Sequence, residues 1–333
     1  MMRKPLVVLL TVGAGACTID YTGDPTASVV PTPEYTLTSD QTHNRFSATI
    51  PPVIRVPDGA IIEAFTREVT DGQLSVESDA GALTTLDFDP IHPLTGPVYV
   101  AGAAPGDVLA VTIHEIEMGA WGWAAIIPGF GFLAEEFPEP YLFTTPIGPR
   151  AQSIAFNDEI TIPLRPFPGV MGVAPPTDSL LSTIPPRANG GNMDNRHLVP
   201  GTTVYFPVFV EGALFSIGDT HAAQGDGEIS GTALEAAMRV VYEVNVIKGG
   251  RPIAEPQYET DDYYAVTAFA PTIDEATRNA ARYMIDYLIH EHGLTRQEAY
   301  VVASMTADFK ISEVVDMPNV LVAMHISKRV FGN

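Results

Sequence analysis

The 333-residue chain has 40 acidic and 18 basic residues, and its formal net charge at pH 7 is −22. A chain of this charge repels a phosphate backbone, which excludes nucleic acid as an expected partner. The length suits one large domain or two intimately packed ones, and 28 Gly and 29 Pro residues punctuate a sequence that is 46% hydrophobic. Such frequent turns are typical of sandwiches and barrels, so we predict a mainly β fold.

The first 17 residues have the pattern of a secretory signal. Met1 to Lys4 is basic, Pro5 to Ala16 is apolar and ends in small residues, and Cys17, the sole cysteine, follows at once. This order also resembles a bacterial lipoprotein cleavage site, in which case Cys17 carries a lipid anchor; ordinary secretion with an incidental cysteine is the alternative. We therefore expect an exported protein, periplasmic or at the cell surface, with a flexible tether over residues 18–40 and a domain over 41–333.

Short segments rich in β-branched and aromatic residues predict strands through the first part of this domain. In one of them Leu109, Val111 and Ile113 alternate with Thr112 and His114, which predicts one buried and one polar face. The predicted strands are 60–69, 98–102, 108–117, 159–164, 203–210, 214–217, 238–247 and 264–270. We expect a β-sandwich-like body that extends to about residue 270.

Two Thr-x-x-Glu capping boxes, at 272–275 and 295–298, predict the starts of two helices. The first helix should end near His292, before Gly293. A last strand is expected over 319–327, which gives a smaller α+β portion over about 271–333. The side chains expected to face inward are Ala280, Ala281, Met284, Tyr287 and Leu288 in the first helix, and Ala299, Val302 and Met305 in the second.

The segment Gly218 to Glu228, with the sequence GDTHAAQGDGE, concentrates groups that can bind a cation or move a proton. If Asp219 to His221 is extended, these two side chains lie on the same face. Gly225 and Gly227 would let the backbone turn and return Asp226 or Glu228 to the same point. A second acidic loop, 189–194, ends in Asp194 and could be brought close by the strands that follow it.

One imidazole with several carboxylates suits zinc or another borderline divalent ion, whereas an all-oxygen subset would suit calcium. The spacing matches no zinc signature of known geometry. The structural alternative is that the aspartates cap turns and that His221 is a hydrogen-bonded loop residue. The residues by themselves leave both interpretations open.

The order of motifs along the body resembles that of the acetamidase/formamidase family. The resemblance runs from His43 to Val330 and rests on motifs in register: Leu94-Thr-Gly-Pro97, Gly102 to Asp107, Gly122-Trp123 before Pro128 to Gly131, Pro168-Gly-Val-Met-Gly172, Gly190 to Asp194, and Tyr205 to Val210 running into Gly218 to Glu228. It implies hydrolysis of short amides to acid and ammonia, a β-sandwich-like fold with an α/β portion, metal binding and a homodimer or higher homo-oligomer. The N-terminal signal and tether depart from the family's pattern, as does His92, where Asn is expected.

Three common amidase mechanisms can be tested against the residues present. A Glu-Lys-Cys site needs a cysteine in the folded domain, and a Ser-Ser-Lys site needs a Gly/Ser-rich loop with a lysine; the sequence offers neither. A Ser-His-Asp site built on Ser216 or Ser304 stays formally open, although no Gly-x-Ser-x-Gly elbow is present. Metal-activated water is the best remaining route.

We therefore predict a metal-dependent hydrolase of small linear amides. Asp194, Asp219, His221 and Asp226 are expected to bind the divalent ion, for which zinc is the first choice and calcium the second. Glu228 is expected to act as the general base and later to protonate ammonia. The roles of Asp226 and Glu228 could be exchanged. The loop from Trp121 to Phe132 is a candidate wall or lid of the site, with simple core packing of its tryptophans as the alternative. The alternative function is a non-catalytic surface lipoprotein that binds a small solute and keeps the metal for stability.

Overall fold

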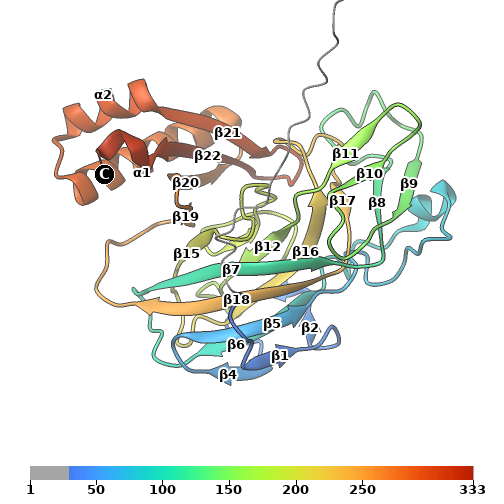
Figure 1. Cartoon of the computed structure of the whole chain (residues 1–333), viewed down its shortest axis with the longest axis horizontal. Coiled ribbons are helices and arrows are strands. Elements are labelled where there is room, and N and C mark those ends of the chain that lie inside the picture. Colours follow the sequence, from blue (N-terminus) through green and yellow to red (C-terminus); the bar gives the residue numbers. More distant parts are fainter. Residues whose placement is uncertain (1–29, 333) are drawn as a thin grey trace, which may run out of the picture. The chain divides into compact units, whose positions relative to one another are not determined.

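The computed structural model describes residues 30–332, and two large β-sheets form the body (Figure 1). The first is nine-stranded, with each strand hydrogen-bonded to the next in this order: β1 (Tyr35–Leu37), β5 (Ala60–Phe65), β18 (Met238–Ile247), β7 (Val108–Met118), β15 (Thr203–Pro207), β19 (Gln257–Glu259), β20 (Tyr263–Ala270), β22 (Val320–Ser327) and β21 (Ala307–Glu313).

The second sheet is also nine-stranded and carries most of the glycine-containing motifs noted above. Its main path is β14 (Gly190–Asn192), β12 (Phe167–Gly172), β16 (Phe215–Ala223), β17 (Leu234–Glu235), β8 (Trp121–Ile126) and β9 (Tyr141–Pro146). Off this path, β6 (Leu94–Val100) pairs with β16, β2 (Thr42–His43) and β4 (Ile54–Val56). Two small sheets pair β10 (Ser153–Ala155) with β11 (Thr161–Pro163), and β3 (Arg45–Phe46) with β13 (Leu181–Ser182).

The main core lies where the inner faces of the two sheets meet. Leu109, Val111 and Ile113 of β7 are fully buried in one cluster with Phe215 and Ile217 of β16. The predicted alternation is confirmed for Leu109, Val111 and Ile113, which are buried, and for Thr112 and His114, which are half-buried; beyond His114 it is interrupted where the pairing with β18 shifts register. The mainly β fold with a sandwich-like body follows from this burial of both inner faces.

Two helices, α1 (Ile273–His292) and α2 (Arg296–Thr306), form the C-terminal α+β portion with β20, β21 and β22 (Figure 1). Short 3-10 helices lie at Ala80–Thr85 and Lys328–Phe331. The Thr272 hydroxyl caps α1, Gly293 ends it with a φ of 66°, and Thr295 and Glu298 form a complete capping box on α2. Both predicted helix starts and the predicted end of α1 are confirmed.

Several expectations need correction. Met305 does not face inward, since its side chain is 71% exposed, whereas Ala299 is buried as expected. The strands β8, β12 and β21 were not predicted; in β12 the Pro and Gly residues suggest a turn, but both neighbouring strands hold it extended. The body also begins before residue 41, because β1 pairs with β5 and Leu37 is fully buried.

The predicted signal and Cys17 lie outside the described residues. Within residues 30–332, no helix is long and apolar enough to span a membrane.

Candidate functional site

A small cavity of about 50 Å³ lies beside β16 and contains the predicted acidic motif. One part of its wall is apolar and is formed by residues such as Phe88, Trp123, Ile127 and Phe130. The other part is polar and is formed by His92, Asn192, Asp194, Asp219, His221, Glu228, Glu235 and Asp316. At roughly 10–15 Å³ for each water-sized group, such a space admits a ligand of only a few heavy atoms.

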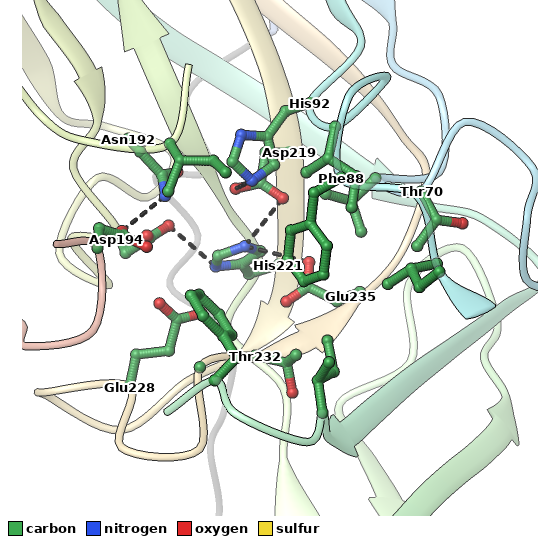
Figure 2. A pocket seen from close by; sticks show the side chains of 18 of the residues that line it. Thr70, Phe88, His92, Asn192, Asp194, Asp219, His221, Glu228, Thr232 and Glu235 are labelled. Atoms are coloured by element: carbon green, nitrogen blue, oxygen red, sulfur yellow. Dashed lines mark hydrogen bonds and ion pairs between the residues drawn. The ribbon is translucent and has the colours of Figure 1, made fainter. Parts of the chain in front are cut away.

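Four segments bring these polar side chains together. Asp219 and His221 lie on β16, and Glu235 on β17 is the cross-strand neighbour of His221. Asp194 lies two residues after the end of β14, and Glu228 lies in the glycine-containing loop after β16. Figure 2 shows these side chains converging on the imidazole of His221.

His221 is the centre of the cluster. Its Nε2 lies 3.3 Å from Asp219 Oδ1 and 3.2 Å from Glu235 Oε2, and its Nδ1 lies 3.7 Å from Asp194 Oδ1. Ligand atoms of Asp194, His221 and Glu228 lie within 4.8 Å of one another, as do those of Asp219, His221 and Glu235. All of these side chains are buried.

Gln224 determines which ring nitrogen of His221 is free. The Gln224 amide nitrogen donates to the backbone carbonyl of Asp194 at 2.6 Å, so its oxygen faces His221 Nδ1 at 2.9 Å. An amide oxygen can only accept, and this network therefore assigns the ring proton to Nδ1. His221 Nε2 faces the carboxylate oxygens of Asp219 and Glu235, which stabilise a second ring proton at this nitrogen.

Burial and mutual repulsion perturb the pKa values of the carboxyl groups. Burial raises the pKa of Asp194, raises that of Glu228 well above its usual range and raises that of Glu235 to about 7. Burial also acts to raise the pKa of Asp219, but the fields of His92 and His221 outweigh it and lower that pKa to about 2. Burial opposes protonation of His221, yet Glu235 and Asp219 outweigh it and raise its pKa well above the usual range.

Backbone strain coincides with the cluster. Asp194, Asp219 and Glu228 have φ angles of 38°, 49° and 45°, in the left-handed region that non-glycine residues rarely adopt. Each such residue costs about 1–3 kcal/mol, and strain of this kind concentrates at functional sites. Here it falls on three of the carboxylates that surround His221.

The chemistry of the donors fits a divalent cation. Asp194 Oδ1 and Glu235 Oε2 are buried and have no hydrogen-bond partner among the described residues. Several buried carboxylates around one imidazole are strongly unfavourable unless a cation or protons compensate their charge. One imidazole nitrogen with several carboxylate oxygens is a donor set that zinc accepts.

The structure brings together four of the five residues predicted for the site, namely Asp194, Asp219, His221 and Glu228. Asp226 is placed elsewhere: its Oδ1 lies 3.4 Å from His197 Nε2, and its side chain does not line the His221 cavity. The roles assigned to the five residues stay predictions.

Sequence reasoning missed Glu235, and it noted His92 only as a departure from the family pattern. Glu235 lies in the otherwise small and apolar run Ala233 to Met238, and an acidic residue in such a run was the available signal. His92 Nε2 lies 3.8 Å from Asp219 Oδ2. Trp123, in the predicted aromatic loop, is both buried and part of the cavity wall, and its Nε1 donates to Glu68 at 2.8 Å.

Comparisons with known proteins found similar sequences and similar structures. A sequence model of the Acetamidase/Formamidase family matches residues 31–182 and 177–333. The chain is 30% identical to an acetamidase of Mycolicibacterium smegmatis, over 78% of this chain and 84% of that protein. It is 27% identical to a formamidase of Methylophilus methylotrophus, over 87% and 89% of the two chains.

Solved structures show the same fold. An acetamidase from Bacillus halodurans superposes with a TM-score of 0.83 at 33% identity, covering 89% of this chain and 98% of that chain. A gamma lactamase from Delftia acidovorans superposes with a TM-score of 0.63 at 26% identity, covering 90% and 94%.

Proposed function

The chain belongs to the acetamidase/formamidase family and is an amidase that cleaves amide C–N bonds; from this premise we propose that it hydrolyses small linear amides, such as formamide or acetamide, with a divalent metal ion. The observation that carries the proposal is a buried imidazole surrounded by four buried carboxylates in a cavity of about 50 Å³. The cavity has room for an amide of a few heavy atoms, and a bound cation would compensate the negative charge of its carboxylates.

We assign the metal to the side of His221 that faces Asp219 and Glu235. Gln224 holds the proton on Nδ1, so Nε2 is the nitrogen free to bind an ion. Asp219 Oδ1 and Glu235 Oε2 are the carboxylate oxygens on that side. An ion held by these three residues, with zinc the first choice, would lower the pKa of water and polarise the amide carbonyl.

Glu228 is the proposed general base and acid. Its carboxylate lies within 4.8 Å of ligand atoms of Asp194 and His221, and burial raises its pKa well above the usual range. A carboxylate that readily accepts a proton can take one from water and return it to the amide nitrogen, so that the C–N bond breaks as ammonia leaves. The apolar wall, including Phe88 and Trp123, would contact the acyl group and exclude bulk water.

A serine mechanism has one visible candidate, the pair of Ser216 and His43. Ser216 Oγ lies 2.7 Å from His43 Nε2, and His43 Nδ1 lies 2.7 Å from the carbonyl of Arg45. Within residues 30–332 no carboxylate hydrogen-bonds His43, Ser216 is buried, and neither residue lines the His221 cavity. We therefore do not assign a catalytic role to Ser216.

The test is ammonia release from formamide, acetamide and propionamide, measured with metal content before and after chelation. We expect activity that chelation removes and added zinc restores. The variant Glu235→Gln should lose metal, whereas Glu228→Gln should retain metal and lose turnover by roughly 10²-fold or more. Full activity of a sample shown to be free of metal would overturn the metal-dependent mechanism.

We further propose that the chain is exported and forms a homodimer or higher homo-oligomer. The N-terminal pattern ending at Cys17 supports export with a lipid anchor. Labelling cells with a radioactive fatty acid should mark the wild type and not Cys17→Ser. Light scattering of the purified protein would test the oligomeric state, and a monomeric mass would contradict it.

A further inference from the structure

A larger cavity adjoins the loop that carries Glu228. We call it the side groove and define it by its apolar residues Phe143, Phe156, Ile162, Ile229 and Leu234. Its volume is about 500 Å³, which lies in the range of sites that hold a drug-sized ligand and is far larger than the His221 cavity.

The side groove and the His221 cavity share a wall. Glu228 and Thr232 line both spaces, and Figure 2 shows the two side chains along the same edge of the His221 cavity. The segment between them is a tight turn, in which the amide of Gly231 donates to the carbonyl of Glu228 at 2.8 Å. Glu228, although buried, thus belongs to the walls of both spaces.

The walls of the groove suit a hydrocarbon. Phe143 and Phe156 pack with their ring centroids 4.8 Å apart, and Phe156 and Ile229 stay substantially exposed. Exposed apolar side chains that line a concave surface gain free energy when a ligand covers them, by about 25 cal/mol for each Å² removed from water. Arg196, Asp226 and Glu228 also line the groove, so it offers no excess of positive charge that would favour an anionic ligand.

We propose that the side groove binds the hydrocarbon part of amide substrates larger than acetamide, while the amide group reaches the His221 cavity past Glu228. The preferred substrate class is then an uncharged primary amide of a medium-chain aliphatic or aryl-substituted acid. The inference rests on the proposed function and changes only the size of substrate. The reaction is still hydrolysis, in which the C–N bond is replaced by a C–O bond and the nitrogen leaves as ammonia.

The experiment compares kcat/KM for acetamide, butyramide, hexanamide and phenylacetamide in the wild type and two variants. Phe156→Asp places a charge in the groove, and Leu180→Asp is the matched control, because Leu180 is also exposed and apolar but does not line the groove. We expect the wild type to cleave hexanamide at least as efficiently as acetamide. The hexanamide-to-acetamide ratio should fall about tenfold or more in Phe156→Asp, which corresponds to at least about 1.4 kcal/mol, and stay unchanged in Leu180→Asp.

A second measurement needs no variant. If the groove holds hydrocarbon, hexanoate should inhibit acetamide hydrolysis by the wild type with a Ki at least about tenfold below that of acetate. Thermal unfolding of each variant verifies that it is folded.

The possible failures are distinguishable. Cleavage of acetamide but not of hexanamide, with hexanoate no better an inhibitor than acetate, would overturn the groove inference and leave the proposed function intact. A Phe156→Asp protein with an unchanged ratio but a smaller oligomer would identify the groove as a subunit interface and also overturn the inference. If a folded, metal-loaded wild type releases no ammonia from any of the amides, both proposals fail.

Discussion

Gly169, in strand β12, provides a sharp test of the site because any side chain there would enter the cluster. A Cβ atom on Gly169 would lie 2.4 Å from Asp194 Oδ1, 2.7 Å from His221 Cε1 and 2.9 Å from the carbonyl oxygen of Asp219. Relaxed contacts are at least about 3.5 Å, so Gly169→Ala requires a shift of roughly 1 Å by the carboxylate or the imidazole. The backbone of Gly169 does not have a positive φ, and the perturbation is therefore steric only.

We expect Gly169→Ala to lower kcat/KM by about 10²-fold, because a displacement of about 1 Å in a preorganised site has an effect of this size. Overpacking should lower the free energy of unfolding by about 1–3 kcal/mol, which the fold should tolerate. The assays are ammonia release, metal content and thermal unfolding. Gly148→Ala is the matched control, since its new Cβ would meet nothing closer than 3.9 Å.

If Gly169→Ala kept the wild-type metal content and a kcat/KM within about twofold of the wild type, the proposed steric role of Gly169 would be wrong. Loss of stability without loss of activity would show that the strand moves as a unit and carries the site with it. Equal losses in Gly148→Ala would show that the assay reports general damage.

Three further predictions concern groups around the site and away from it. Gln224→Leu removes the acceptor that holds the proton on His221 Nδ1, and metal affinity should fall by about 10- to 100-fold in a titration monitored by activity; unchanged affinity would exclude this tautomer control. Ser216→Ala should keep kcat within about threefold of the wild type, because Ser216 hydrogen-bonds His43 outside the cavity, and a loss of 10³-fold would restore the serine mechanism. Burial raises the pKa of Glu255 to about 7, so the folded chain retains a proton that the unfolded chain releases nearer its ordinary value. The resulting stability is complete below about pH 4 and is lost as the pH rises through 7, and Glu255→Gln should remove this dependence. Urea unfolding at pH 5 and pH 8 should therefore show the wild type losing on the order of 3 kcal/mol relative to the variant, and an equal difference at both pH values would contradict the assignment.

Helix ends and a strand with one buried face could be predicted from the local sequence. The capping boxes and Gly293 defined α1 and the start of α2, since a cap needs only residues within one turn of the helix end. The alternation of buried and half-buried side chains from Leu109 to His114 in β7 was also predictable, because burying one face of a strand imposes a period of two. The motif between Asp219 and Glu228 was recognisable by its concentration of carboxylates and glycines around His221.

Only the tertiary structure decided which residues form the site. Glu235 joins it because β17 pairs with β16 in a register that sets it opposite His221, and pairing across strands leaves little trace in the local sequence. Asp226, only two residues from Glu228, turns to His197 instead, because the backbone of the loop fixes which carboxylate faces inward.

The proton position on His221 and the steric role of Gly169 likewise depend on segments far apart in the chain. The sequence by itself determined that an acidic motif around His221 stands in a mainly β amidase of this family. Which nitrogen and which oxygens face one another was decided by strand register and loop conformation, since these depend on the packing of the whole domain rather than on any one segment.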